Sequence, residues 1–426
     1  MSNQDNSPEA IANPSYTSKS EAERVFSVFG SLKKDAEKTK SSSAVDATSD
    51  NQPVLTMSAI GKLGRFGNQL FQYAFLRICA EKSGARVECP PWIGQTLFGH
   101  KDATVSKRLP PAIERLEGEK NLFDLVPEFI PYLEKIADAK SSRVGLDALD
   151  SGLVNVDLWG FFQFHTRYLK PDKQYFRSLF QPVSDLKSPL ENGLNVLCSK
   201  GKTIVGIHIR RGDYLRQPRT RFTLVFPAKW YYEWLDGIWN DLEDPVLFLC
   251  SDDLESVIHD FKKFSPVTWK DLDVKLPERM KDLDIEFYID FFMLSNCDVV
   301  VTSNSNFSFI ACMLNQRAKM FVRPHWDFST KFTVFDPWDS NPLLRLGEKQ
   351  LKLSKSWADV LYVTYSTQGI WVMLKSIFIY LPISIIMGWT LRAYLGYQIK
   401  GIIGIVKSLL SILGWRSIWK TPSKSS

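Results

Sequence analysis

Two adjacent arginines at the end of an apolar run are the strongest chemical signal in this chain. The run Ile204–Ile209 has the composition of a buried strand of a parallel sheet, and Arg210 and Arg211 follow it directly. Ligands of open α/β sheets sit beyond the carboxyl ends of the strands. Guanidinium groups stay charged and bind phosphate oxygens through paired N–H groups. We therefore predict a diphosphate site here, against the alternative of an ordinary charged strand end.

A glycine-rich loop precedes a predicted helix within Ile60–Ala80. Glycines before a helix let backbone N–H groups approach an anion closely. The segment matches neither the dinucleotide fingerprint nor the P-loop, so a plain strand–helix turn is an equal alternative. The apolar positions that repeat at helical spacing are Leu70, Phe71, Ala74, Phe75 and Ile78.

Small polar residues mark the start of another predicted helix. The strand Asp298–Thr302 is expected to end there, and the apolar run Phe309–Leu314 resumes after the polar residues. Serines and asparagines at a helix start are most often caps, but they can also donate hydrogen bonds to a phosphate at the positive end of the helix. The polar residues are Ser303, Asn304, Ser305, Asn306 and Ser308.

Three motifs, GRFGNQLFQYA, HIRRGDY and SNSNFSF, occur in this order. Together they resemble the galactoside α1,2-fucosyltransferases, a family of HxRRxD fucosyltransferases, over roughly Met57 to Pro342. The resemblance implies an α/β fold of the GT-B type, with two Rossmann-like domains facing across a cleft. It also implies inverting transfer of L-fucose from GDP-β-L-fucose to a galactose hydroxyl, O2, of a glycan acceptor.

The resemblance assigns roles to residues of the motifs. Arg210, Arg211 and Asp213 would be catalytic, because negative charge grows on the β-phosphate as GDP leaves and a fixed cation stabilises it. Ser251–Asp253 would meet the guanine or ribose, although a cap for a helix starting near Leu254 is an equal interpretation. The implied donor-binding residues are Gly64, Gly67, Asn68, Gln69, His208, Ser251, Asp252, Asp253, Ser303, Asn304, Ser305 and Phe307.

The general base is left open by the sequence. Asp213 lies inside a motif, but it could equally brace Arg211. Some relatives carry a glutamate where this chain has Pro218. His165 and Glu286 have no positional support, so no residue is assigned.

Two DxD patterns raise the possibility of a metal site. Asp271–Asp273 and Asp282–Asp284 could each offer two oxygens to Mg²⁺ or Mn²⁺, as in a metal-dependent glycosyltransferase that uses a UDP-sugar. Both lie in the charged stretch Lys270–Glu286, which favours a solvated loop. We therefore expect no metal or other cofactor. A membrane-tethered, non-catalytic glycan-binding protein is the second alternative function.

Composition suggests four segments in the 426 residues. We expect a disordered arm at 1–52, an acceptor-side α/β domain at 53–195, a GDP-fucose-binding α/β domain at 196–350 and a basic, hydrophobic helical tail at 351–426. The six cysteines form no CxxC motif, so we expect mostly buried free thiols and a reducing compartment. The strands expected in the donor half are Thr203–Arg210, Val246–Ser251, Asp298–Thr302 and Lys319–Arg323.

The tail predicts membrane association. Gly369–Leu391 is long enough to span a bilayer and has only Lys375 as a charge. Residues 369–426 hold seven basic residues and no acidic one, so the rest of the chain carries about −1 and nucleic acid is not an expected partner. We expect residues 369–420 to meet a lipid bilayer, with a self-packing helical hairpin as the alternative. No apolar segment in 1–52 suggests a signal peptide, and the side of the membrane, cytosol or Golgi lumen, is left open.

Overall fold

The computed structural model describes residues 52–114, 142–145, 148–215, 224–324 and 332–344. The chain divides into one unit of residues 1–346 and another of residues 347–426, and all described residues belong to the first. The predicted arm up to residue 51 and the predicted tail, with its apolar segment at 369–420, lie outside the described residues. The four predicted domain boundaries stay a prediction.

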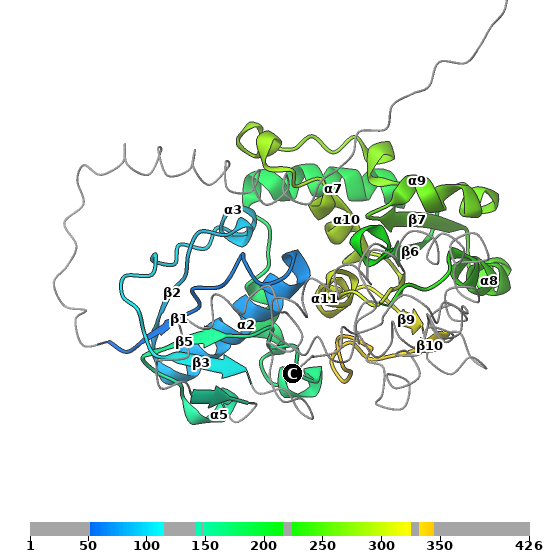
Figure 1. The fold of residues 1–426 in the computed structure, drawn as a ribbon. Helices are drawn as coiled ribbons and strands as arrows, with labels where there is room; N and C mark the ends of the chain where they lie inside the picture. Colours follow the sequence, from blue (N-terminus) through cyan, green and yellow to red (C-terminus); the bar gives the residue numbers. More distant parts are fainter. Residues whose placement is uncertain (1–51, 115–141, 146–147, 216–223, 325–331, 345–426) are drawn as a thin grey trace, which may run out of the picture. The chain divides into compact units, whose positions relative to one another are not determined.

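Within the described residues, the first half of the unit contains a five-stranded sheet in the order β2-β1-β5-β3-β4 (Figure 1). All of its neighbouring strands are parallel. Their carboxyl ends therefore meet at one edge. The strands are β1 Val54–Thr56, β2 Arg86–Glu88, β3 Pro111–Glu114, β4 Ser142–Val144 and β5 Val156–Trp159.

The second half contains another five-stranded sheet, in the order β10-β9-β8-β6-β7, again counted over the described residues. Its strands are parallel except for the edge strand β10, which pairs antiparallel with β9. The four strands predicted for this half are confirmed to within a residue or two. They are β6 Thr203–Ile209, β7 Pro245–Ser251, β8 Val299–Val301 and β9 Met320–Pro324, followed by β10 Phe332–Val334.

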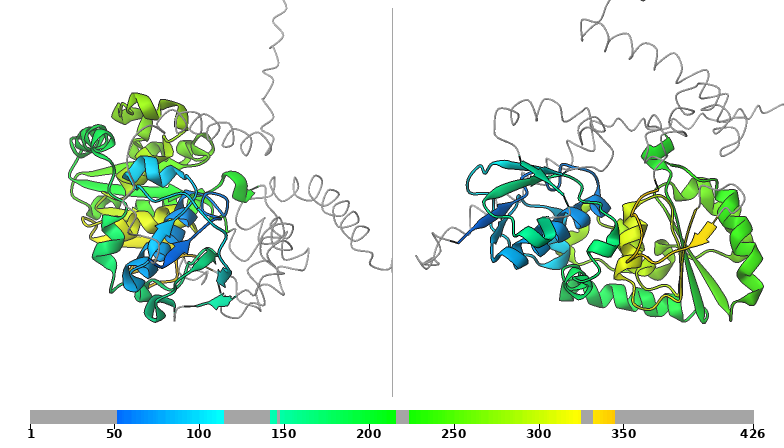
Figure 2. Two further views of the ribbon diagram at one scale, coloured as in Figure 1. Left: turned by 90° about the vertical axis from the view of Figure 1, so that its left-hand side faces the viewer. Right: turned by 90° about the horizontal axis from the view of Figure 1, so that it is seen from below.

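Helices alternate with the strands in both halves, which confirms the predicted α/β class and its two separate sheets (Figure 2). The α-helices are α2 Phe66–Ser83, α3 Ile93–Phe98, α5 Ala148–Ser151, α6 Lys173–Ser178, α7 Ser184–Cys198, α8 Ala228–Ile238, α9 Leu254–Val257, α10 Phe287–Leu294 and α11 Asn306–Leu314. Short 3-10 turns occur at Thr166–Tyr168, Gly212–Leu215, Trp239–Asp241, Ile258–Phe264, Trp269–Leu272 and Glu278–Leu283.

Strand β6, which lies between β8 and β7, is buried on both faces, as its apolar run predicted. Val205, Ile207 and Ile209 belong to a core cluster that includes Tyr231 and Leu235 of α8. Residues of opposite parity, such as Ile204, belong to the larger cluster on the other face. Because successive strand residues point to opposite faces, a continuous apolar run suits exactly this two-sided burial.

Helix α2 joins the two halves. It packs against α11 of the second half, and its first residue, Phe66, lies among aromatic rings of α10 and α11. The ring of Phe66 is 5.0 Å from that of Phe287 and 5.1 Å from that of Phe291. The helix ends at Gly84, whose left-handed backbone (φ 64°) donates its N–H to the Ala80 carbonyl. This helix therefore carries the first motif into contact with the third.

Two segments differ from what their local composition favours. The aromatic run Trp159–His165 has the composition of a strand, but β5 ends at Trp159 and Phe162 has a positive φ of 52°. The Phe162 ring instead stacks on Phe75 at 4.3 Å, so ring packing rather than strand pairing fixes this segment. The segment Tyr168–Phe180 forms only the end of a 3-10 turn and the short helix α6, because Pro171 interrupts the helical pattern.

All six cysteines are free, as predicted, and Cys198 alone among them is partly exposed. Its Sγ lies 3.3 Å from an Nη atom of Arg317. Among the residues that the structure describes, no helix combines the length and apolar character needed to cross a membrane.

Candidate active site

The end of β6 presents Arg210 as a rigidly held cation. Its Nη1 lies 2.8 Å from Oδ2 of Asp252, and its Nη2 pairs with Oδ1 of Asp213. The guanidinium also stacks on the ring of Tyr214, 4.8 Å from the ring centroid. The side chain is only 12% exposed. Parallel pairing of β6 with β7 explains the contact with Asp252, since both strands end at the same edge.

Asp252 organises the loop that follows β6. Besides pairing with Arg210, it accepts a hydrogen bond of 2.7 Å from the backbone N–H of Arg211. A Cβ at Gly212 would lie 2.3 Å from Oδ2 of Asp252, so the motif's glycine is required by this close approach. Both oxygens of Asp252 are thus engaged by the loop, a role that neither the base-binding nor the capping interpretation anticipated.

The neighbours of Asp252 also depart from the capping interpretation. Asp253 stands at the N-cap of α9 but makes no side-chain cap bond there. Ser251 donates from Oγ to the carbonyl of Ile209 at 2.7 Å and accepts from the N–H of Asp253. Ser251 therefore fastens the end of β7 to the end of β6.

Arg211 differs from Arg210 in its surroundings. Its Nε is buried and has no hydrogen-bond partner among the described residues. An unpartnered buried donor of a charged group is costly, so it marks a position where an acceptor is missing. Of the two arginines predicted to bind phosphate, Arg210 is held by two carboxylates, whereas Arg211 has an N–H donor without a partner among the described residues.

His208 links the second motif to the third. Its Nδ1 lies 2.9 Å from Oγ of Ser303, and its ring lies 5.2 Å from that of Phe307. Burial, assisted by the charge of Arg210, lowers the pKa of His208 to about 3. The buried site therefore favours the neutral imidazole over the imidazolium.

The first and third motifs meet where two helices begin. A Cβ at Gly67, in the first turn of α2, would lie 2.5 Å from the backbone nitrogen of Phe307 in the first turn of α11. Only glycine permits this approach. The N-terminal N–H groups of both helices lie close together as a result, and their dipoles reinforce one another as an anion site.

An amide network crosses between the halves at the same place. Oδ1 of Asn68 accepts from Nε2 of Gln163 at 2.8 Å and from Nδ2 of Asn306 at 2.5 Å. Gly64, with φ 72°, packs so closely that its Cβ would lie 2.0 Å from Nδ2 of Asn68. Gln69 donates weakly to the Gly64 carbonyl, at 3.4 Å. The sequence reasoning gave Gln163 no role. A polar residue within the aromatic run Trp159–His165 could have indicated that its side chain has a specific partner.

Arg65 is a residue of the site that the sequence reasoning missed. It stands at the N-cap of α2, and its Nη2 lies 3.3 Å from Oδ2 of Asp213. Asp213 therefore bridges Arg210 of the second half and Arg65 of the first. Among the described residues, Asp213 braces Arg210 and Arg65, and not Arg211 as the alternative interpretation had it. Its position between Gly64 and Gly67, inside the glycine-rich first motif, could have indicated that Arg65 belongs to the site.

The remaining residues of the third motif have structural partners. Asn304 pairs with the backbone of Leu344, accepting at 2.7 Å and donating at 3.1 Å, and so ties down the segment after β10. Ser305 is the N-cap of α11 without a side-chain cap bond. Both side chains are buried beside the helix start, with Ser305 6% exposed.

Asp290 of α10 is a second residue to which the sequence reasoning assigned no role. Its Oδ1 is buried without a hydrogen-bond partner in the described part of the chain. Burial raises the pKa of the Asp290 carboxyl well above its usual range. Burial, and to a lesser degree the Asp290 carboxyl, raise the pKa of the Cys250 thiol, and α10 packs against β7, the strand that holds Cys250. An apolar helix, FYIDFFML, hid this residue, because a single acid in such a run resembles a surface position.

The other acidic and basic possibilities have local explanations. Asp271 accepts from the N–H and Oγ1 of Thr268 in a capping box, and Asp273 and Asp284 end 3-10 turns with left-handed backbones. Within the described residues, no cluster of His, Cys, Asp and Glu side chains could hold a metal ion. His165 lies beside Arg167 and Asp339, and burial together with Arg167 lowers its pKa.

Comparison with known proteins agrees with this geometry. The sequence model of glycosyl transferase family 11 matches residues 37–333. Galactoside alpha-(1,2)-fucosyltransferase 1 of Rattus norvegicus is 24% identical over 314 residues, covering 67% of this chain and 77% of the relative. The protein of the same name from Pan troglodytes is 26% identical over 194 residues, which is 45% of this chain and 49% of the relative.

Solved structures of fucosyltransferases share a weaker likeness. Fucosyltransferase NodZ from Bradyrhizobium has a TM-score of 0.41 at 12% identity, covering 67% of this chain and 99% of that one. An Arabidopsis thaliana FUT1 variant in complex with GDP has a TM-score of 0.40 at 12% identity, covering 73% and 78%. The family match is the stronger finding, since it spans well over half of the sequence and includes all three motifs. The chain belongs to glycosyl transferase family 11.

Proposed function

We propose that this protein is an inverting fucosyltransferase, which moves L-fucose from GDP-β-L-fucose to a galactose hydroxyl of a glycan, forming an α1,2 linkage to O2. The family match and the names of its relatives support the reaction. The GT-B arrangement, with donor and acceptor sides on the two halves, belongs to the same proposal and is supported by the two separate sheets.

The observation that carries the proposal is the convergence of the three motifs. Arg65 and Arg210 pair with Asp213 and Asp252, and Arg211, which follows Arg210, adds a third guanidinium whose Nε has no hydrogen-bond partner among the described residues. The N-termini of α2 and α11 add partial positive charge. A departing GDP develops negative charge that such a fixed arrangement stabilises. We therefore propose transfer without a metal, with arginines taking the role of the cation.

Asp290 is proposed to recognise the guanine base. Its Oδ1 has no hydrogen-bond partner among the described residues, and its helix, α10, packs against β7, the strand that ends at Ser251. Guanine offers two adjacent donors, N1–H and N2–H₂, which a carboxylate can accept together. Asp252 is less suited because its oxygens already hold Arg210 and the N–H of Arg211.

Membrane association through residues 369–420 is part of the proposal. It rests on the sequence alone: an apolar stretch with spaced cations and no acidic residue. Flotation of the full chain with vesicles tests it. We expect binding to phosphatidylcholine vesicles that increases when anionic phosphatidylglycerol is added and decreases with salt. Equal absence from both kinds of vesicle would refute the lipid contact.

The reaction itself is tested with purified full-length chain, GDP-fucose and a panel of β-galactosides, with the linkage read by NMR. We expect GDP release coupled to fucosylation at O2, unchanged by EDTA. Turnover of a UDP-sugar with loss of activity in EDTA would favour the metal-dependent alternative. Binding of glycans without any turnover would favour the non-catalytic one.

The matched control is Arg210→Ala. Loss of its charge should reduce kcat/KM by about 10³-fold, the size typical for removing a principal electrostatic stabiliser. Full activity in this variant would remove the assigned role of the arginine.

A further inference from the structure

A pocket of the first half lies away from the first motif. It is a cavity of about 370 Å³ between the end of α2 and the start of β2, within the usual range of small-molecule sites, roughly 300–1,000 Å³. Gln52 precedes β1 and Arg86 begins β2, so the pocket lies at the amino ends of these parallel strands. The first motif follows the carboxyl end of β1. The pocket is therefore separate from the proposed transfer site.

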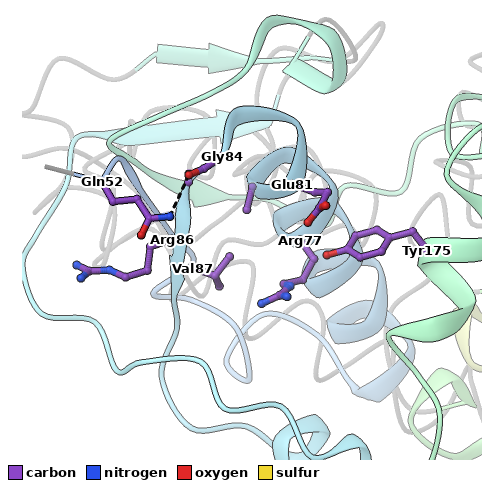
Figure 3. Close-up of a pocket in the computed structure, with 9 residues that line it drawn as sticks. Gln52, Arg77, Glu81, Gly84, Arg86, Val87 and Tyr175 are labelled. Atoms are coloured by element: carbon purple, nitrogen blue, oxygen red, sulfur yellow. Dashed lines mark hydrogen bonds between the residues drawn. The ribbon is translucent and has the colours of Figure 1, made fainter. Parts of the chain in front are cut away.

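The lining of this pocket combines a small apolar floor with a polar rim. Val87 lies between Arg77 and Arg86, and the hydroxyl of Tyr175 points toward Glu81 and Arg77 (Figure 3). Gln52 is held at one end through a hydrogen bond of 3.1 Å to the Gly84 carbonyl. The floor consists of Ala80, Gly84, Ala85 and Val87, and the rim of Gln52, Arg77, Glu81, Arg86 and Tyr175.

The two arginines of the rim have donors that nothing in the described chain uses. Nη1 of Arg77 pairs with Asp102 at 2.8 Å, and Nη2 of Arg86 pairs with Glu88 at 2.7 Å. The Nε atom of each is buried and lacks a hydrogen-bond partner among the described residues. Both side chains are nevertheless partly exposed, 32% for Arg77 and 38% for Arg86, so the outer N–H groups of the guanidiniums can donate to hydroxyl or carbonyl oxygens in the pocket.

The charge of the pocket argues against an anion. Each arginine is neutralised by its own carboxylate, and Glu81 adds a further negative group to the rim. The end of α2 contributes partial negative charge, because the last carbonyls of a helix carry it. A phosphate or sulfate would meet a carboxylate and a helix C-terminus here. A neutral ligand with both donors and acceptors fits better.

We propose that this pocket binds one neutral hexose unit of a glycan. A pyranose has a C–H face that suits a floor of alanine and valine, and a ring of hydroxyls that can accept from arginine and donate to Glu81. Tyr175 offers an amphipathic ring at the edge. The pocket would hold a sugar without acting on it, and the proposal is independent of the fucosyl transfer at the motifs.

The test is a count of sugar sites in the full chain. Saturation-transfer NMR and titration with methyl β-galactoside are carried out with GDP present at saturation. We expect two sites with about millimolar affinity, a usual strength for so small a ligand. In Glu81→Ala the second site should weaken by about tenfold, since a hydrogen bond to a charged group is lost. In Ala85→Trp it should disappear, because the indole fills the floor.

Matched controls separate this pocket from the transfer site and from general damage. Glu191→Ala removes an exposed glutamate of α7 that pairs only with Lys187 at 3.6 Å among the described contacts, and it should keep both sites. Arg210→Ala should lose turnover but keep the pocket. Turnover of a monosaccharide acceptor by Glu81→Ala and Ala85→Trp should match the wild type, which also shows that they fold. Sugar binding that stays unchanged in both pocket variants, or displacement of the pocket sugar by inorganic phosphate, would overturn the proposal.

Discussion

The second sheet carries an arginine–aspartate cluster at each of its edges, and the two clusters differ in balance. At the amino edge, Arg317 binds Asp298 through two hydrogen bonds of 2.7 and 3.0 Å, and Asp298 also accepts from the N–H of Ile204. One cation meets one anion there. At the carboxyl edge, Arg65 and Arg210 pair with Asp213 and Asp252, and the neighbouring Arg211 adds a third cation, whose Nε has no partner among the described residues.

We interpret the balanced pair as a contribution to stability and the unbalanced cluster as part of the ligand site. Through Asp298, the balanced pair joins the segment before β9, the residue before β8 and the start of β6, and so helps to fix the strand order. The unbalanced cluster keeps a net positive charge at the carboxyl edge of the sheet, because its two aspartates do not neutralise its three arginines. When charged residues at the end of a strand all pair with one another, they have a structural explanation. They indicate a ligand site only when a hydrogen-bond donor or a charge remains without a partner.

The largest expected effect comes from replacing one arginine at each edge of the sheet by lysine, which tests the difference between the two clusters. Arg210→Lys keeps the charge but loses the planar fork that binds two carboxylates at once, so kcat/KM should fall by about 10²–10³-fold. Arg317→Lys should lower the melting temperature and leave kcat/KM within about twofold. Thermal unfolding and fucosyl-transfer kinetics measure both. Equal loss of activity in the two variants would abolish the distinction.

A smaller effect is expected from Asp290→Asn. The raised pKa of Asp290 means that its carboxyl tends to be protonated, whereas guanine should bind the ionised form. Affinity for GDP should therefore rise with pH up to the pKa of Asp290 and level off above it. The variant should lose this dependence and bind GDP about 10–100-fold more weakly, the scale of hydrogen bonds to a charged group.

Inosine diphosphate is the matched ligand for that measurement, because it lacks the exocyclic amine and carries the same phosphates. Calorimetry should show a preference for GDP in the wild type and none in Asp290→Asn. A preference that survives the substitution would place the base elsewhere.

The contact between the two helix starts predicts a loss of stability. Gly67→Ala forces a methyl group to within 2.5 Å of the backbone of Phe307, which should cost about 1–3 kcal/mol of unfolding free energy. Gly237→Ala in α8 is the control, since its new Cβ meets nothing within 4 Å and helix propensity should favour it slightly. Chemical denaturation measures both. Unchanged stability in Gly67→Ala would mean that the halves separate without penalty.

The smallest effect concerns Arg65, whose side chain is 56% exposed. Arg65→Ala removes a partly screened pair with Asp213, worth about 0.2–1 kcal/mol. The KM for GDP-fucose should rise up to about fivefold at low salt, and this difference should shrink at 0.5 M NaCl. A salt-independent change would show that Arg65 acts by shape rather than by charge.

Local patterns predicted the elements of the second half well, because each strand is a short apolar run bounded by polar residues. The same reasoning failed at Trp159–His165, where the aromatic residues pack by their rings around Phe75 instead of forming a strand. It also assigned Asp252 to a nucleotide, although contact with Arg210 and the N–H of Arg211 occupies its oxygens. Asp290 escaped notice because its burial depends on packing across the sheet, which no spacing reveals.

The sequence by itself determined the α/β class, the four principal strands of the second half and the three motifs that identify the family. These follow from local composition and from the residue types that phosphate chemistry requires. Only the tertiary structure decided that Asn68 meets Asn306 and that Arg65 meets Asp213, residues far apart along the chain. Such contacts depend on how α2 and α11 pack together, and local pattern does not encode the approach of two helix ends through Gly67.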